Sequence, residues 1–151
     1  MAEPEFTPDE LATEEWRNVI DYEGTYSVSN LGRLRRDAPR QQPGWGGPCQ
    51  VGRIMKPTVM PSGYFYTNLC LNGRKKQHRI HRLLAAAFIG PCPISYECNH
   101  KDGNKANNRL SNIEYVTSSA NKLHAVALGL ARGSIRMPNS RRPPRHCARP
   151  Q

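Results

Sequence analysis

The alternation of apolar and polar positions predicts a β-hairpin in the middle of the chain. Residues 64–71 (YFYTNLCL) are rich in aromatic and β-branched side chains, which favour a strand. They are followed by Asn72-Gly73, the favoured two-residue type I′ turn, and by a returning segment over residues 74–80. The returning segment is strongly basic, so one side of the hairpin is expected to face solvent.

The second half of the chain predicts a helix and then a strand–loop–strand–helix unit. Residues 81–89 (HRLLAAAFI) place apolar side chains at helical spacing, and Gly90-Pro91 ends the helix. Thr117 or Ser118 can cap a later helix, and Gly129 can close it. The segments of this ββα unit are strands over 96–100 and 113–116, a polar loop over 101–112 and a helix over 119–128.

The first half predicts short strands separated by turns. Residues 15–36 contain β-favouring pieces, and residues 37–50 hold three prolines and three glycines, as expected of an exposed loop. We therefore expect an α+β protein with a small β-rich N-terminal module. The predicted organisation is an acidic flexible leader (1–14), the N-terminal module (15–56), a domain containing the hairpin and the ββα unit (57–130) and a basic disordered tail (131–151).

Charge is distributed unevenly along the chain. Residues 1–26 hold eight acidic side chains and one basic side chain, whereas residues 27–151 hold four acids and 21 bases, local balances of −7 and +17. A strongly basic body is typical of proteins that bind a phosphate backbone, although it also serves solubility. The acidic leader could mask this basic body, and its removal should then tighten non-specific binding.

Composition argues against membrane and disulfide-stabilised classes. No apolar run approaches the roughly 20 residues of a membrane span, and the polar acidic start is unlike a secretory signal, so a cytoplasmic protein without a membrane partner is expected. The five cysteines are odd in number and form no C-x-x-C pair. They predict buried or incidental thiols rather than a disulfide framework or a structural zinc site.

The predicted ββα unit is dense in the side chains that phosphodiester hydrolysis requires. Hydrolysis needs a general base for water, a hard divalent metal ion and a group that orients the base. A histidine has a suitable pKa for the first task, and Asn or Asp oxygens suit Mg²⁺. The candidates are Asn99, His100, Asp102, Asn104, Asn107, Asn108, Asn112, Asn121 and His124.

These residues resemble the nuclease module of HNH homing endonucleases. The resemblance rests on the run NHKDGNKANNRLSNIEYVTSSAN over residues 99–121, preceded by HRLLAAAFIG. Residues 15–36 resemble the N-terminal module, NUMOD4-like, that accompanies such nucleases in phage and bacterial genes. GRIMKP and SGYFYTNLCLNGRKKQHRIHRL resemble the hairpin that joins the two modules. The resemblance covers about residues 15–130 and implies a DNA endonuclease with a mobile-element role.

The resemblance also implies roles for individual residues. His100 would be the general base, Asn112 would orient it by a polar contact, and Asn121 and Asn99 would bind one Mg²⁺ or Mn²⁺ ion. Many relatives carry an aspartate at the position of Asn99, so this ligand lacks a formal charge. Each residue also has a structural interpretation, as a turn, cap or solvent-facing side chain.

Two accessory candidates are weighed against simpler roles. His124 lies three residues after Asn121 on the same helix face and could assist the metal ion or contact a phosphate. Asp102 belongs to an Asp-Gly turn and could also assist the metal ion. His81, by contrast, is expected to fix local packing.

Two basic strands are expected to contact double-stranded DNA. They contribute Arg74, Lys75, Lys76 and Arg79 from the hairpin and Arg33, Arg35 and Arg36 from the N-terminal module. The hairpin cations could equally keep an edge strand soluble. A monomer with one active site should nick one strand. Cleavage of both strands would require a homodimer or two successive binding events. The alternative function is a non-catalytic, sequence-specific DNA-binding protein that retains the same fold.

Overall fold

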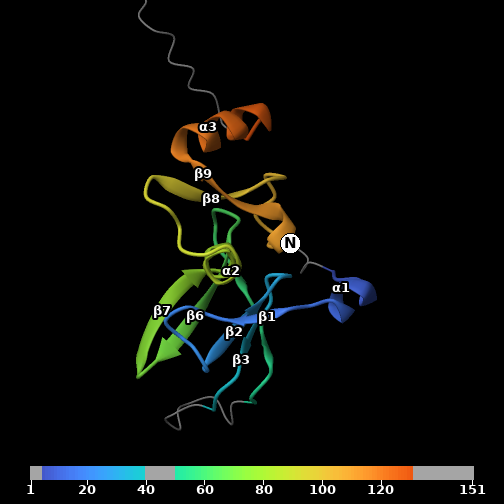
Figure 1. Ribbon diagram of the computed structural model, residues 1–151, viewed down its shortest axis with the longest axis vertical. Helices are drawn as coiled ribbons and strands as arrows, with labels where there is room; N and C mark the ends of the chain where they lie inside the picture. Colours follow the sequence, from blue (N-terminus) through green and yellow to red (C-terminus); the bar gives the residue numbers. More distant parts are fainter. Residues whose placement is uncertain (1–4, 40–49, 131–151) are drawn as a thin grey trace, which may run out of the picture.

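The computed structural model describes residues 5–39 and 50–130, and its architecture is α+β, as predicted (Figure 1). A first sheet contains β1 (Trp16–Asn18), β2 (Tyr26–Ser29), β3 (Leu34–Arg36) and β4 (Ile54–Met55). A second contains β5 (Thr58–Val59), β6 (Phe65–Leu71) and β7 (Arg74–Arg79), and a third pairs β8 (Tyr96–His100) with β9 (Ile113–Thr117). The helices are α1 (Pro8–Ala12), α2 (Ile80–Phe88), α3 (Ser118–Ala127) and the 3₁₀ turn η1 (Leu110–Asn112).

The central hairpin forms as predicted. Asn72 and Gly73 have φ angles of +51° and +74°, the left-handed conformations that a type I′ turn needs at both positions. The turn sets the register in which Leu71 faces Arg74 and Cys70 faces Lys75. As a result β6 buries alternate side chains, while the first four residues of β7 are exposed.

The first sheet and the hairpin are joined through Tyr26. Its side chain is 2% exposed, and its hydroxyl donates to the Cys70 carbonyl oxygen and accepts from the Cys70 backbone N–H. Val28 and Leu34 on neighbouring strands bury their side chains on the same core. One hydrophobic core therefore serves both sheets.

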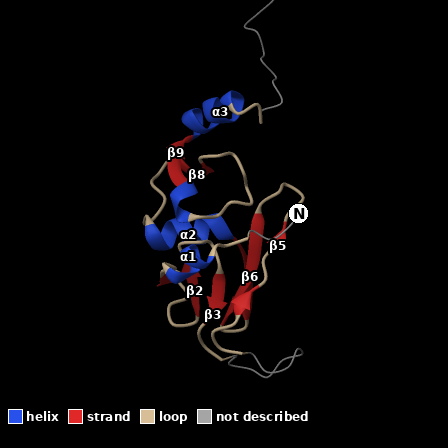
Figure 2. Cartoon of the chain, turned by 90° about the vertical axis from the view of Figure 1, so that its right-hand side faces the viewer, coloured by secondary structure: helices blue, strands red, loops and turns tan. Residues whose placement is uncertain are grey.

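Helix α2 lies at the centre of the molecule and connects the two sheets to the ββα unit (Figure 1). Ile80, Leu83, Leu84 and Ala85 are buried; the helical spacing predicted Leu83 and Leu84, whereas Ile80 was expected to end the preceding strand. A fully buried leucine such as Leu84 contributes roughly 1.5–3 kcal/mol to stability. In the view of Figure 2 the ββα unit lies above α2, and strands β2 and β3 lie below it.

The ββα unit also forms as predicted. Strands β8 and β9 are antiparallel, with His100 opposite Ile113 at the end of the ladder. The Thr117 hydroxyl accepts a hydrogen bond from the Ala120 backbone N–H at 3.3 Å and thereby caps α3. None of the helices within residues 5–39 and 50–130 is long and apolar enough to cross a membrane.

The N-terminal segment differs from the flexible leader that its composition predicted. Residues 8–12 form α1, which begins with a capping box between Thr7 and Glu10. Glu10 also forms an ion pair with Arg109 at 2.6 Å, so the segment is attached to the ββα unit. The composition of this segment could not reveal the ion pair, because Arg109 lies 99 positions further along the chain. The predicted tail from residue 131 and most of the predicted loop over residues 37–50 lie outside the described residues.

Candidate active site in the ββα unit

His100 ends β8 and is held by a single side-chain hydrogen bond. Its Nε2 lies 3.1 Å from Oδ1 of Asn108, and the side chain of Asn108 donates through Nδ2 to the Ala106 carbonyl oxygen at 3.4 Å. Because Oδ1 only accepts, Nε2 of His100 carries the proton and donates it. Nδ1 is then the nitrogen with the free lone pair, which is the form a general base requires.

Burial keeps His100 neutral. The residue is 4% exposed, and this burial lowers the pKa of its imidazole, which the hydrogen bond to Asn108 and the charge of Asp102 offset only in part. Within the described part of the chain, the buried side-chain polar atom without a hydrogen-bond partner is Nδ1 of His81. Nδ1 of His100 makes no hydrogen bond to the described residues.

Two rings pack against His100. The His81 ring lies 4.9 Å away and the Tyr64 ring 6.0 Å away, measured between ring centroids. Burial, together with the neighbouring His100, lowers the pKa of His81 to about 3. His81 is therefore neutral at pH 7, and its position agrees with the packing role expected for it.

The Asn112 side chain makes no hydrogen bond to His100 within the described residues, whereas the sequence led us to expect an orienting polar contact. Its Oδ1 accepts from the Asp102 backbone N–H at 3.0 Å, and its Nδ2 donates to the Asp102 carboxylate at 2.9 Å and to the Asn107 carbonyl oxygen at 2.8 Å. Asn112 thus closes the loop between β8 and β9. The contact to His100 comes instead from Asn108, which the sequence offered only as one asparagine among several.

Asp102 is fully engaged in organising the same loop. Burial would raise the pKa of its carboxyl group, but hydrogen bonds from Asn107, Asn112 and the Asn104 backbone outweigh this effect and lower the pKa. The carboxylate is therefore ionised and held by the loop. This arrangement supports a structural role for Asp102 more directly than metal binding.

Asn99 points to the opposite face of β8 from His100, because neighbouring residues of a strand alternate, and Asn121 of α3 contacts Glu97 on the face of Asn99. Asn99 donates through Nδ2 to Glu114 at 3.1 Å and to Nδ1 of His124 at 3.2 Å. Asn121 donates through Nδ2 to Glu97 at 2.7 Å. The amide oxygens of both asparagines make no hydrogen bond to the described residues.

These side chains fit a hard divalent metal ion. Asn99 and Asn121 both lie where the β8–β9 pair meets α3. Glu97 and Glu114 contribute carboxylates beside them. Mg²⁺ and Mn²⁺ prefer oxygen ligands, and Mg²⁺ uses few protein ligands because it keeps several waters. No group of three or more His, Cys, Asp or Glu side chains within residues 5–39 and 50–130 could hold a metal ion, so amide oxygens would have to contribute.

His124 has a defined tautomer. Its Nδ1 accepts from Asn99, and its Nε2 donates to the Lys101 carbonyl oxygen at 3.0 Å. The ring thus ties α3 to the end of β8. His124 orients Asn99 through this hydrogen bond. Asn121 and His124 are three residues apart and so lie on one face of α3, the face that meets β8.

The cysteines in the described residues are free thiols. Burial raises the pKa of Cys98 to about 12, so this residue is a protonated thiol, and Cys70 and Cys92 are also unpaired. Cys49 and Cys147 lie outside the described residues.

The predicted DNA-binding cations differ in their availability. Arg74, Lys75 and Lys76 are exposed on β7, and Arg79 stacks over Tyr64 at 4.9 Å. The three arginines at β3 are each held by an internal partner. Arg33 pairs with Glu14, Arg35 with Asp37, and Arg36 with carbonyl oxygens at the end of the strand.

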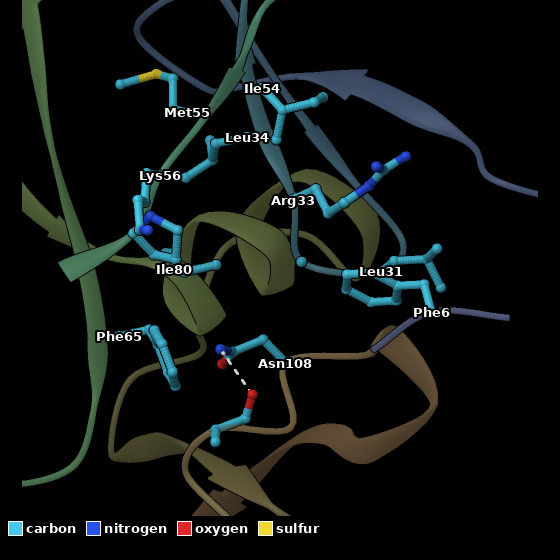
Figure 3. A pocket seen from close by; sticks show the side chains of 13 residues that line it. Phe6, Leu31, Arg33, Leu34, Ile54, Met55, Lys56, Phe65, Ile80 and Asn108 are labelled. Atoms are coloured by element: carbon cyan, nitrogen blue, oxygen red, sulfur yellow. Dashed lines mark hydrogen bonds between the residues drawn. The ribbon is translucent and has the colours of Figure 1, made fainter. Parts of the chain in front are cut away.

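A cavity of about 310 Å³ lies between the N-terminal sheet and the loop of the ββα unit (Figure 3). Asn108 lines it from the loop, and Leu34, Phe65 and Ile80 line it from the core. Its lining is mainly apolar. The cavity reaches the residue that holds His100 but not the proposed metal ligands.

Comparisons with known proteins agree with this geometry. Residues 78–123 match the HNH endonuclease family, and residues 14–70 match the NUMOD4 motif. The DNA endonuclease I-HmuI of Bacillus phage SP01 is 30% identical over 115 residues, which cover 76% of this chain and 59% of that protein. An uncharacterised HNH endonuclease of Acanthamoeba polyphaga mimivirus is 33% identical over 115 residues, covering 76% of this chain and 31% of that protein.

A solved structure described as DNA binding and cleavage by the HNH homing endonuclease I-HmuI matches with a TM-score of 0.65 at 30% identity. The match covers 80% of this chain and 62% of that one. The chain spans less than two thirds of the length of these relatives. The two family matches together run from residue 14 to residue 123 and follow the order of the N-terminal sheet, hairpin and ββα unit. The chain therefore carries a segment that matches the HNH endonuclease family, with a segment that matches the NUMOD4 motif ahead of it.

Proposed function

We propose that this chain is a metal-dependent DNA endonuclease of the homing type that nicks one strand per active site. The observation that carries the proposal is the state of His100. Its Nε2 is hydrogen-bonded to Asn108, its pKa is lowered, and its Nδ1 makes no hydrogen bond to the described residues. A neutral imidazole with one oriented nitrogen is suited to remove a proton from water.

Two sets of side chains would serve the two sides of the reaction. In an in-line displacement the attacking water and the departing oxygen lie on opposite sides of phosphorus. His100 would accept the proton of the attacking water, and the amide oxygens of Asn99 and Asn121 would hold the metal ion. A Mg²⁺ or Mn²⁺ ion bound there would neutralise charge on the departing oxygen. Asn112 contributes by holding the loop that follows His100.

The partner in this proposal is double-stranded DNA. The exposed cations of β7 would contact phosphates, an interaction that neutralises charge and releases condensed counterions. The matching solved structure is described as DNA binding and cleavage, which supports the same partner for this chain. A monomer carries one site and would nick, whereas cutting both strands would need a homodimer or a second visit.

One observation favours the alternative function, a DNA-binding protein without activity. Asn99 supplies no formal charge to a metal ion, and the described residues hold no cluster of three charged or imidazole ligands. Weak metal binding would leave the fold and the basic surface intact. The two functions therefore differ in cleavage and not in DNA binding.

Plasmid nicking tests the proposal. Purified protein with Mg²⁺ or Mn²⁺ should convert supercoiled plasmid carrying a cognate site to open circles, and EDTA should abolish this. His100→Ala should lower the rate by roughly 10²–10⁴-fold, the usual contribution of a general base. His78→Ala is the matched control, because it removes a partly buried histidine of the hairpin that bonds Tyr22.

The outcomes separate the two functions. DNA binding without cleavage, under either metal and on DNA that includes the target, would support the DNA-binding protein. Cleavage by His100→Ala at the rate of the wild type would show that another group is the base.

A further inference from the structure

We propose that Asn108 is a positioning residue for His100 and that the turn over residues 29–33 of the N-terminal module holds Asn108 in place. The proposal rests on the proposed function, in which His100 is the general base. It assigns the NUMOD4 part of the chain a role in the chemistry of the nuclease unit in addition to any contact with DNA.

Asn108 selects the tautomer of His100. The residue is 8% exposed, and its Oδ1 lies 3.1 Å from Nε2 of His100. Its own Nδ2 points to the Ala106 carbonyl oxygen, which fixes the amide so that the oxygen faces the histidine. Without this acceptor, nothing in the described residues would favour a proton on Nε2 over one on Nδ1.

The turn at residues 29–33 presses against Asn108. Gly32 has a φ of +78°, and a Cβ built there would lie 2.6 Å from both Cβ and the carbonyl oxygen of Asn108. Only glycine permits this approach. Two residues away, the Asn30 carbonyl oxygen accepts the Leu110 backbone N–H at 2.7 Å, so the turn contacts the loop at two points.

Asn108 also borders the cavity of about 310 Å³, which Gly32, Leu34 and Phe65 line as well (Figure 3). Close packing normally fixes a buried side chain from all sides, and a void removes that support. The position of Asn108 therefore depends strongly on the turn, and a displaced turn would leave the amide room to move away from His100.

The test on Asn108 measures the tautomer of His100 directly. Nitrogen-15 chemical shifts of the imidazole, recorded in EDTA, should show the Nε2–H form in the wild type and in Asn108→Asp, which keeps an acceptor oxygen. Asn108→Ala should lower the Nε2–H fraction to that of an unconstrained imidazole. In nicking assays Asn108→Ala should lower kcat by about 10–100-fold with KM for DNA nearly unchanged, and Asn108→Asp should recover much of the loss.

The test on the turn uses a matched pair of glycines. Gly32→Ala and Gly24→Ala both impose a left-handed conformation on alanine, with φ of +78° and +71°, but a Cβ at Gly24 meets nothing within 4 Å. Both variants should lose similar stability from backbone strain. Only Gly32→Ala should also shift the His100 nitrogen signals and lower kcat.

Three results would overturn the proposal. They are an Nδ1–H tautomer in the wild type, an unchanged tautomer in folded Asn108→Ala, and equal effects of the two glycine variants on the His100 signals. If Asn108→Ala does not fold, the tautomer in the wild-type spectrum and the comparison of Gly32→Ala with Gly24→Ala still test the proposal. A wild type that shows the Nε2–H form but never cleaves DNA would refute the proposed function and leave the positioning role intact.

Discussion

Strands β3 and β7 are both basic in sequence, but the structure makes only β7 available to a partner. Arg33, Arg35 and Arg36 lie at β3, and Arg74, Lys75 and Lys76 begin β7. The first three are partly buried and the second three are exposed. Equal charge in the sequence therefore does not mean equal capacity to bind phosphate.

The arginines at β3 are neutralised or stacked within the molecule. Arg33 donates to the Glu14 carboxylate through Nε at 2.8 Å, and Arg35 donates to Asp37 at 2.7 Å while its guanidinium lies over the Trp16 ring at 4.4 Å. Contact with DNA would require breaking these interactions. Their main effect is to hold the N-terminal segment and the strand ends.

The cations that begin β7 have no such partners. Arg74, Lys75 and Lys76 form no ion pair or side-chain hydrogen bond within the described residues. The strand is also an edge of its sheet, and exposed lysines on an edge strand prevent aggregation. The exposed cations of β7 therefore suit both solubility and the proposed DNA binding, and measurement can distinguish these roles.

Replacement of Arg74, Lys75 and Lys76 by glutamine should have the largest effect on DNA binding. Loss of three phosphate contacts should weaken binding by roughly 100-fold near physiological salt, and it should reduce the slope of log K against log salt by about 3. Titrations of a DNA duplex between low and moderate salt would measure both. If affinity and slope are unchanged, the strand serves solubility alone.

Arg33→Gln should mainly affect stability. The Glu14 side chain is 5% exposed, and removal of its partner leaves a nearly buried carboxylate with weaker compensation. The expected loss is about 1–3 kcal/mol in the free energy of unfolding, with little change in DNA affinity. Denaturant unfolding would measure the first and the duplex titration the second. A large loss of affinity with unchanged stability would place Arg33 in the DNA interface instead.

Removal of residues 1–14 should tighten non-specific DNA binding by roughly 3–10-fold at low salt and hardly at all at high salt. The deletion takes away Glu10 and Glu14, so Arg109 and Arg33 lose their carboxylate partners. Full-length protein with Glu10→Gln and Glu14→Gln should behave similarly. Asp9→Asn with Glu15→Gln is the matched control, because it changes net charge equally without removing an ion pair within the described residues. If the two double variants bind DNA with equal affinity, the tighter binding results from the change in net charge and not from the loss of the ion pairs.

The Glu10–Arg109 pair should give a small pH dependence of stability. The Arg109 hydrogen bond lowers the pKa of Glu10 from 4.5 to about 2 in the folded state. A depressed folded pKa stabilises the protein above the unfolded pKa, and this contribution is lost as the pH falls from about 4.5 towards 2. The difference in Tm between wild type and Glu10→Gln should therefore be present at pH 7 and shrink over this range. A difference that does not change with pH would mean that the carboxylate charge is not involved.

Much of the fold could be predicted because its signals are local. The Asn72-Gly73 turn determined the hairpin register, and Thr117 determined the start of α3. The N-terminal segment could not be predicted in this way. Composition alone suggested disorder, but Glu10 reaches Arg109 across 99 positions of the chain.

The candidate site was predicted in part. The motif located His100, Asn99 and Asn121 in one ββα unit, and the structure places them on its two faces, where their catalytic and metal-binding roles remain proposals. The partner of His100 was assigned to Asn112, whereas the hydrogen bond comes from Asn108. Both asparagines lie in one polar loop, and spacing cannot tell which of them the folded loop turns towards the histidine.

The sequence by itself determined the order of the elements, the hairpin register and the residues capable of chemistry, because turns, caps and side-chain periodicity act over a few positions. Only the tertiary structure decided which cations are exposed and which asparagine holds His100. Those outcomes depend on contacts between distant segments, such as Gly32 against Asn108 and Glu14 with Arg33. Such contacts form only when the core brings the N-terminal sheet and the ββα unit together, and no local pattern encodes them.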